Sequence, residues 1–183
     1  MRGAMTVEND PRPPISDCHI VLVGLMGTGK STLGARLANR LQRQFLDNDV
    51  LLERQTGQTA ASLQRDLGED VLHRLEADVL LDCLDARPAA VIAAAASTVL
   101  SARVRDALHD TAFVIWLRTD LQVLAQRLIN PQTRPLSGDI GVALARQDHD
   151  REALYASVAD IVVDTTAKDA HQTIEDVIGR IVR

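Results

Sequence analysis

The sequence predicts an α/β fold, with a parallel sheet of about five strands and helices on both of its faces. Two observations lead to this prediction. Short apolar runs alternate with amphipathic helical patterns over residues 17–183 of the 183-residue chain. A glycine-rich, phosphate-binding loop also lies at the junction of the first apolar run and the first helical pattern.

The apolar runs and helical patterns indicate where the individual elements lie. The expected strands are residues 19–25, 44–46, 89–94, 111–117 and 160–163. A helix is expected to begin at Lys30, directly after the glycine-rich loop. The clearest helical pattern runs from residue 69 to about residue 86, with Leu72, Leu75 and Val79 at three- and four-residue spacing. A last amphipathic pattern closes the chain.

The glycine-rich loop predicts a nucleotide-binding site and, with it, a P-loop NTPase fold. Residues 24–31 read GLMGTGKS and match the phosphate-binding signature G-x-x-x-x-G-K-[ST]. In such a loop, backbone N–H groups surround phosphate oxygens, and the N-terminus of the following helix attracts negative charge. Lys30 would reach the terminal phosphates, and the Ser31 hydroxyl would hold Mg²⁺. The expected nucleotide-binding residues here are Gly27, Thr28, Gly29, Lys30, Ser31 and Thr32.

Composition and charge exclude several classes of protein. A net charge of −5 and a pI of about 5.5 disfavour binding to a nucleic-acid backbone. No apolar run reaches membrane-spanning length, and the N-terminus lacks the apolar stretch of a secretion signal. Cys18 and Cys83 show no metal-ligand spacing and fit a reducing compartment. We therefore expect a cytoplasmic monomer that binds neither nucleic acid nor a membrane.

Two segments lack apolar periodicity. Residues 1–16 hold three of the six prolines, and we interpret them as a disordered leader that precedes a single domain over residues 17–183. Residues 130–141 contain two prolines and two glycines. A loop of this kind is either a plain surface excursion or a lid, and the phosphate-binding loop favours a lid over an active site.

The second predicted strand leads into two aspartates, Asp47 and Asp49. Because the carboxyl ends of neighbouring parallel strands open onto one crevice, both side chains should face the bound phosphates. We expect Asp47 to be the partner of Ser31 on Mg²⁺, and Asp49 to orient or deprotonate an acceptor hydroxyl. A turn or a helix cap is the alternative role for these aspartates.

From about Cys18 to the C-terminus, these residues resemble the shikimate kinases, a family of small P-loop kinases. The resemblance rests on residues 24–32, Asp47, Asp49, residues 53–57, 126–127 and 134–136, and Arg151 four residues before Tyr155. It implies that ATP and a small hydroxylated acceptor are the substrates, that Mg²⁺ takes part, and that the pathway is aromatic amino acid biosynthesis. It also implies that Asp47 lies on the magnesium side and Asp49 at the acceptor hydroxyl.

The resemblance assigns roles to three arginines as well. Arg127 is similar to the arginine that packs on the adenine of the nucleotide. Arg134 resembles the lid arginine near the transferred phosphate, and Arg151 resembles the arginine that holds the acceptor carboxylate. The expected catalytic residues are therefore Lys30, Asp49 and Arg134.

The residues expected to bind the acceptor, called here the acceptor half of the site, depart from the family pattern at two places. Ala95, Ala96 and Ser97 stand where the family has three glycines, so we expect crowding by added Cβ atoms and costly backbone angles. His73 stands in place of a helix arginine, whose bidentate guanidinium an imidazole cannot reproduce. His73 and Glu76 share one helical face and form either part of this site or a solvated pair. The expected acceptor-binding residues are Asp49, His73, Ala95, Ala96 and Arg151.

The sequence leaves three functions open. The first is an ATP-dependent kinase whose acceptor is shikimate, and the second is the same reaction on another hydroxylated acceptor. The third is a nucleotide-binding regulatory protein without transfer activity. Asp49, Arg134 and Arg151 favour an enzyme, because a nucleotide binder needs no acceptor base or lid arginine. The sequence has no N-K-x-D segment, which disfavours a GTPase, and residues 50–53 suit the shikimate kinase pattern better than that of a gluconate kinase.

Overall fold

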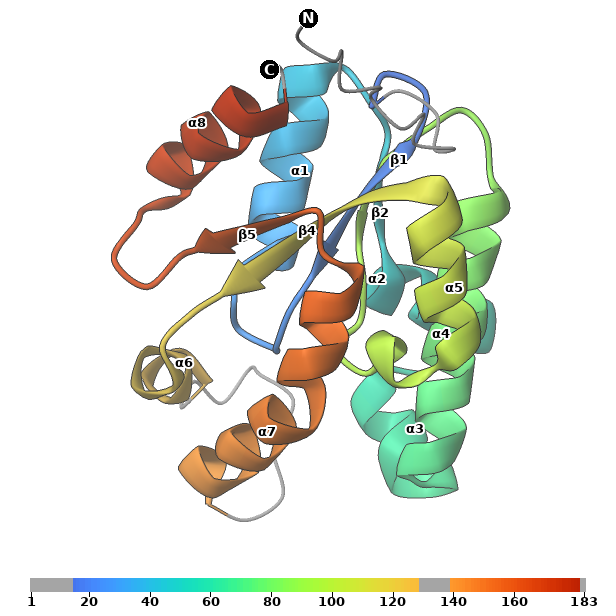
Figure 1. Cartoon of the computed structure of the whole chain (residues 1–183). Helices are drawn as coiled ribbons and strands as arrows, with labels where there is room; N and C mark the ends of the chain where they lie inside the picture. Colours follow the sequence, from blue (N-terminus) through green and yellow to red (C-terminus); the bar gives the residue numbers. More distant parts are fainter. Residues whose placement is uncertain (1–14, 129–138, 182–183) are drawn as a thin grey trace, which may run out of the picture.

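Five parallel strands form the centre of the fold, in the order β2-β3-β1-β4-β5 (Figure 1). The structure is a computed structural model that describes residues 15–128 and 139–181. Its strands are β1 (His19–Val23), β2 (Phe45–Asp47), β3 (Val91–Ala93), β4 (Ala112–Arg118) and β5 (Ile161–Asp164). In the central register, Ile20 of β1 lies opposite Val91 on one side and Phe113 on the other. The predicted parallel sheet is confirmed, with strand ends shifted by one or two residues.

Eight α-helices and one 3₁₀ helix, η1, surround the sheet in the described part of the chain (Figure 1). They are α1 (Lys30–Leu41), α2 (Asn48–Thr56), α3 (Ala60–Leu67), α4 (Glu69–Asp85), η1 (Thr98–Leu100), α5 (Ala102–Thr111), α6 (Leu121–Leu128), α7 (Ile140–Val158) and α8 (Ala170–Ile181). The helix predicted to begin at Lys30 and the helix predicted over residues 69–86 are both confirmed. None of the helices described is long and apolar enough to cross a bilayer.

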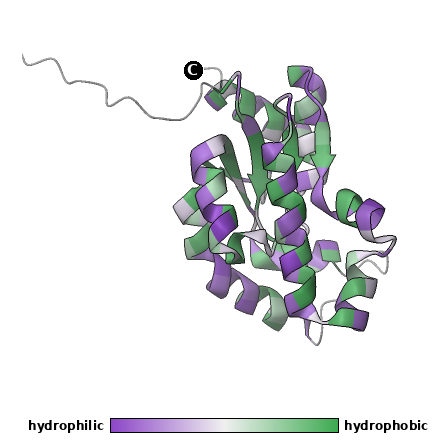
Figure 2. Ribbon diagram, turned by 90° about the vertical axis from the view of Figure 1, so that its right-hand side faces the viewer, coloured by the Kyte–Doolittle hydropathy of each residue, from purple (hydrophilic) through white to green (hydrophobic). Residues whose placement is uncertain are grey.

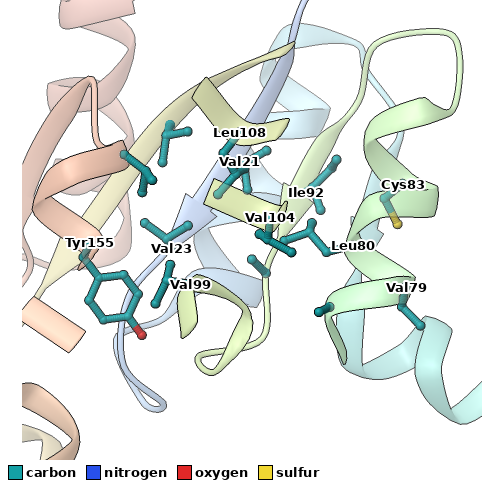
Figure 3. Packing of buried hydrophobic residues seen from close by; sticks show 14 of the residues in the cluster. Val21, Val23, Val79, Leu80, Cys83, Ile92, Val99, Val104, Leu108 and Tyr155 are labelled. Atoms are coloured by element: carbon teal, nitrogen blue, oxygen red, sulfur yellow. The ribbon is translucent and has the colours of Figure 1, made fainter. Parts of the chain in front are cut away.

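The core has two layers, one on each face of the sheet, because successive side chains of a strand point to opposite faces. Ile20 and Leu22 of β1 pack with α1 and α8 on one face. Val21 and Val23 pack on the other face with apolar residues of α2 through α7, including Leu80, and Figure 3 shows part of this layer. Figure 2 shows mostly hydrophobic strands and helices that alternate hydrophobic with hydrophilic residues, as helices covering a buried sheet require.

The two segments without periodicity fall mainly outside the described residues. Residues 1–14 of the predicted leader do so, while the carbonyl oxygen of Ser16 accepts a hydrogen bond of 2.8 Å from Arg43 Nη2. Most of the predicted lid over residues 130–141, including Arg134, also lies outside the described part. The last residues of that segment begin α7, where the Asp139 carboxylate accepts a hydrogen bond from the backbone N–H of Gly141 at 2.8 Å.

A buried histidine stands at the start of the central strand. His19 is only 1% exposed. Its Nδ1 accepts a hydrogen bond from the backbone N–H of Ala90 at 3.2 Å, and its Nε2 lies 3.0 Å from the carbonyl oxygen of Ala86. A neutral ring with its proton on Nε2 satisfies both contacts, whereas a second proton on Nδ1 would remove the acceptor for Ala90. Burial lowers the pKa of His19, and the charge of Arg87 lowers it further.

We therefore expect the protein to lose stability through His19 as the pH falls. The folded-state pKa lies below the value of about 6.5 expected in the unfolded chain, so the unfolded state binds the proton first. This contribution to stability is complete above about pH 6.5 and is lost as the pH drops toward the folded-state pKa, by up to about 1.4 kcal/mol per pH unit. Urea unfolding between about pH 5 and pH 8 measures the slope.

The matched pair of variants is His19→Gln and His109→Gln. The imidazole of His109 is 70% exposed, so its removal should leave the pH slope close to that of the wild type. His19→Gln should flatten the slope, because its side chain does not titrate in this range. Equal slopes in the wild type and both variants would contradict this assignment.

Candidate active site

The loop between β1 and α1 has a backbone suited to holding phosphate. Gly24, Gly27 and Gly29 adopt φ values of +139°, +85° and +93°, which residues with a side chain rarely adopt. A Cβ added at Gly24 would lie 2.4 Å from the carbonyl oxygen of Leu117, because the end of β4 packs directly on the loop. A Cβ added at Gly29 would meet no described atom within 4 Å. The loop thus leaves open space at the N-terminus of α1, where phosphate oxygens bind.

Lys30 folds back onto this loop. Its Nζ donates hydrogen bonds to the carbonyl oxygens of Gly24 at 2.8 Å and Leu25 at 2.9 Å. Burial lowers the pKa of Lys30 to about 8, against the opposing influence of the Asp49 and Asp47 carboxylates. The lysine is therefore a half-buried cation whose charged form a bound phosphate would stabilise.

Three threonine side chains tie the loop to the ends of β4 and β5. The Thr28 hydroxyl is buried and donates to the carbonyl oxygen of Leu25 at 2.9 Å. The hydroxyl oxygens of Thr119 and Thr165 lie 2.6 Å apart, and the Thr165 hydroxyl lies 3.5 Å from the carbonyl oxygen of Thr28. These bonds fix the loop against the carboxyl edge of the sheet, so the phosphate site is formed before a ligand binds.

A cavity of about 310 Å³ adjoins the loop and is large enough for part of a nucleotide. Its lining residues are Gly27, Thr28, Gly29, Thr32, Leu33, Leu117, Arg127, Thr165, Lys168, Ala170 and Thr173. Arg127 of α6 crosses its edge, with Nη1 3.3 Å from the carbonyl oxygen of Gly27 and Nη2 3.3 Å from that of Thr165. Arg127, which the resemblance predicts to pack on the base, therefore lies beside the phosphate loop.

The part of this cavity that follows β5 could not be predicted from the sequence. Thr165, Lys168, Ala170 and Thr173 belong to no motif, and their spacing carries no chemical signal. Their position directly after a strand is the one indication available, because ligands of parallel sheets bind beyond the carboxyl ends of the strands.

Replacing Arg127 with alanine is expected to weaken ADP binding about tenfold, since a guanidinium stacked on a base contributes this much. Titration calorimetry with ADP measures the change. Gln126→Ala is the matched control, because Gln126 is the exposed neighbour of Arg127 on α6 and lines no part of the cavity. Equal ADP affinity in the two variants would show that Arg127 does not contact the base.

Asp47 and Ser31 offer the oxygen ligands that Mg²⁺ prefers. Asp47 Oδ1 caps α2 by accepting hydrogen bonds from the backbone N–H groups of Asp49 at 3.0 Å and Val50 at 3.4 Å. The cap that the sequence left as an alternative is therefore present. Within residues 15–128 and 139–181, Asp47 Oδ2 makes no hydrogen bond, and Ser31 is exposed on the first turn of α1. This donor set fits Mg²⁺ that is also bound to phosphate oxygens.

No group of three or more His, Cys, Asp or Glu in the described part of the chain could hold a metal ion by itself. Kinases that use ATP bring a divalent metal into the site with the nucleotide. A metal ion at this site would accordingly need ligands from the phosphates as well as from the protein.

The acceptor half is built around the carbonyl oxygen of Ala96, in the turn between β3 and η1. Tyr155 of α7 donates its hydroxyl to this oxygen at 2.7 Å, and Arg151 Nη1 donates to it at 3.3 Å. The Tyr155 ring is buried and stacks on Trp116 with the ring centroids 5.8 Å apart. Burial raises the pKa of Tyr155, which keeps its hydroxyl a donor. Arg151 is only 6% exposed, so a carboxylate there would meet a desolvated guanidinium.

Ala95, Ala96 and Ser97 adopt ordinary backbone angles. Gln42 is the one non-glycine residue with positive φ among those described. Ser97 has φ −83° and ψ −17°, a right-handed conformation that leads into η1. The expectation of costly, glycine-only angles is therefore wrong, because none of the three residues has a positive φ. The side chains themselves are the remaining difference from a glycine run.

Glu76 of α4 is part of this buried wall. It is 1% exposed, its carboxylate accepts a hydrogen bond from the Ser97 hydroxyl, and its carbonyl oxygen accepts one from Asn48 Nδ2 at 3.3 Å. The alternative of a solvated His73–Glu76 pair is wrong, since these contacts remove Glu76 from solvent. His73 lies one turn earlier, with Nε2 3.4 Å from a carboxylate oxygen of Glu69 and its side chain 21% exposed.

The charged side chains of both halves act electrostatically on Lys30. The pKa of Lys30 responds to Asp49, Asp47, Arg151 and Glu76, in that order after burial. These residues come from the end of β2, from the first residue of α1, and from α2, α4 and α7. The structure thus brings the predicted phosphate lysine, both aspartates and the predicted acceptor arginine into one electrostatic site, and it adds Glu76.

Comparison with known proteins identifies the family. The family model for shikimate kinase matches residues 26–182. The shikimate kinase of Rippkaea orientalis is 36% identical over 166 residues, which cover 90% of this chain and 86% of that protein.

Solved structures agree with this match. The shikimate kinase from Acinetobacter baumannii, in complex with shikimate, superimposes with a TM-score of 0.85 and 31% identity, covering 90% of this chain and 93% of that chain. A gluconokinase from Sinorhizobium meliloti, with a TM-score of 0.59 and 16% identity over 93% of this chain and 94% of that chain, shares the fold alone. The chain belongs to the shikimate kinase family, whose members are phosphotransferases that act on a hydroxyl acceptor.

Proposed function

We propose that this protein transfers the γ-phosphoryl group of ATP, bound with Mg²⁺, to a hydroxyl group of shikimate or a similar hydroxylated acid. The observation that carries this proposal is that Lys30 rests on the phosphate loop, Arg151 is buried against the turn after β3, and the charges of Asp49, Asp47, Arg151 and Glu76 all act on the pKa of Lys30. A nucleotide-binding regulatory protein would have no use for the acceptor half of this arrangement. The relative from Acinetobacter baumannii was solved with shikimate bound, which supports the same class of acceptor here.

The residues divide the work of phosphoryl transfer. The loop N–H groups and the N-terminus of α1 hold the phosphates, and Lys30 balances the charge that develops on the transferred group. Asp49 lies exposed on the first turn of α2 and would take the proton of the acceptor hydroxyl. Ser31 and Asp47 would hold Mg²⁺, which neutralises phosphate charge when bound. The role of Arg134 as the lid arginine stays a prediction.

Arg151 would hold the carboxylate of the acceptor. Its guanidinium has several N–H donors, and Nη1 also bonds the Ala96 carbonyl oxygen, so the group is fixed in orientation before the acceptor binds. His73 remains a proposed second contact, weaker than an arginine would be. Ala95 and Ala96 would form the surface on which the acceptor ring rests.

A second candidate is the same reaction on a different hydroxylated acid. It is favoured by the side chains of Ala95, Ala96 and Ser97, which take up space in the acceptor half where a glycine run would leave it open. Incubation with ATP, Mg²⁺ and a panel of cyclic and linear hydroxy acids and polyols distinguishes the two candidates. ADP release that depends on shikimate supports the first. Release that depends on another acid supports the second, and no acceptor-dependent release refutes both.

The same proposal includes the location, the oligomeric state and the domain organisation of the protein. We infer a cytoplasmic monomer that binds neither nucleic acid nor a membrane, supported by the net charge of −5 and by two buried, free thiols. Residues 17–183 are proposed to form one domain after a leader at 1–16, supported by the single sheet that spans the described chain. Aromatic amino acid biosynthesis is the pathway in which shikimate phosphorylation takes place.

A further inference from the structure

A serine hydroxyl is bonded to a buried carboxylate in the wall of the acceptor half. Ser97 donates its hydroxyl to Glu76 Oε2, and the two residues are 5% and 1% exposed. Ser97 comes from the turn before η1 and Glu76 from the middle of α4, so the contact joins two separate elements. A hydrogen bond to a buried carboxylate is among the stronger contacts that a side chain makes.

This pair lies beside the groups that would bind the acceptor. Ser97 directly follows Ala96, whose carbonyl oxygen is held by Arg151 and Tyr155. The hydrogen bond from Ser97 therefore holds the Glu76 carboxylate in the same wall as Arg151 and Tyr155, and its charge also acts on the pKa of Lys30 and on that of Tyr155. An acceptor held between Arg151 and Lys30 would therefore lie next to the Glu76 carboxylate.

A buried carboxylate needs hydrogen-bond donors for its oxygens. With no side chain at position 97, Oε2 of Glu76 would lose the Ser97 hydroxyl, and a hydroxyl of the bound acceptor would be a suitable replacement. With Ser97 present, the protein itself supplies that donor. An acceptor hydroxyl directed at this oxygen then gains little, and it competes for space with the serine side chain.

We infer that Ser97 determines acceptor specificity, because its hydroxyl takes the place of one acceptor hydroxyl at the Glu76 carboxylate. The substrate class that follows is a hydroxylated carboxylic acid that need not carry a hydroxyl group on the side facing Glu76. This inference rests on the proposed phosphoryl transfer and specifies its acceptor. Ser97 acts here through Glu76, as a positioning residue.

The test compares shikimate with its monodeoxy analogues, each of which lacks one ring hydroxyl. The measured quantity is the ratio of kcat/KM for shikimate to kcat/KM for each analogue. The wild type should use at least one analogue within about threefold of shikimate, because Ser97 already satisfies Glu76. A preference for shikimate of more than about thirtyfold over every analogue would overturn the inference with the wild type alone.

Two variants separate the hydroxyl from the volume of the side chain. Ser97→Ala removes the hydroxyl and keeps the Cβ, whereas Ser97→Gly removes both. In each variant the preference for shikimate over that analogue should rise about 10- to 100-fold, because the buried carboxylate has lost the Ser97 hydroxyl and a hydroxyl of the acceptor can replace it. Ser157→Ala is the control, since Ser157 is exposed on α7 and donates only to the carbonyl oxygen of Leu154 among the described residues.

The ratio is taken on one protein sample, so a loss of folded protein in a variant does not change it. A rise in the glycine variant alone would overturn the inference, because volume and not the hydroxyl would then set the preference. Shikimate use with an unchanged ratio in both variants overturns the inference and leaves the proposed function standing. Failure of the wild type to phosphorylate shikimate, any analogue or any other acid of the acceptor panel overturns both.

Discussion

Lys30→Ala is expected to lose about 10²–10³-fold in phosphoryl transfer and most of the stabilisation that ATP gives to the wild type. The charges of the predicted phosphate and acceptor residues all act on the pKa of Lys30. Its Nζ lies 2.8 and 2.9 Å from two carbonyl oxygens of the phosphate loop, close to where the phosphates are expected to bind. Alanine removes this charge without disturbing the backbone of α1, because alanine is the best helix former.

Two measurements check this variant. Turnover is followed by ADP release, and nucleotide binding by the rise in melting temperature with ATP and Mg²⁺ at millimolar concentration. Arg40→Ala is the matched control, because Arg40 is an exposed cation at the other end of the same helix. A wild-type melting temperature that does not respond to nucleotide would contradict the assignment of the loop.

Asp49→Asn is expected to reduce turnover by about 10²–10⁴-fold while the affinity for ATP stays nearly unchanged. Asparagine has almost the shape of aspartate but cannot take the proton of the acceptor hydroxyl. Asp49 is exposed on the first turn of α2, and α2 keeps its cap because the cap is the neighbouring Asp47. The predicted effect therefore falls on kcat and leaves the fold intact.

Two further variants complete the comparison. Asp66→Asn replaces an exposed carboxylate on α3 and should leave turnover unchanged. Asp47→Asn should instead raise the concentration of Mg²⁺ needed for half-maximal activity. Full turnover by Asp49→Asn on the true acceptor would show that another group takes the proton.

The sheet and the phosphate loop could be predicted from the sequence because their signals are local. A buried parallel strand is apolar along its whole length, as β1 is, and the glycines of the loop are required by left-handed backbone angles at Gly24, Gly27 and Gly29. Strand direction alone predicts that Asp47 lies at the carboxyl edge, where it ends β2, whereas Asp49 lies on the first turn of α2 and not in an extended segment with Asp47.

The acceptor wall depends on contacts between residues far apart in the chain. The burial of Glu76 could not be predicted from the sequence, because its hydrogen bonds come from Ser97 and Asn48, which lie 21 and 28 residues away in the chain. The backbone angles of Ala95 and Ser97 depend on how the chain enters η1, which a run of small residues does not reveal. The far side of the nucleotide cavity, after β5, has no motif for the same reason.

The central claim is that this protein forms a phosphate ester on a hydroxyl group of shikimate at the expense of ATP. The most direct measurement is a ³¹P NMR spectrum of the wild type incubated with ATP, Mg²⁺ and shikimate. We predict a new phosphate monoester resonance that grows in equal amount with ADP and is absent when Lys30→Ala replaces the wild type. A spectrum in which ATP remains intact, or in which inorganic phosphate is the only new product besides ADP, would contradict this function.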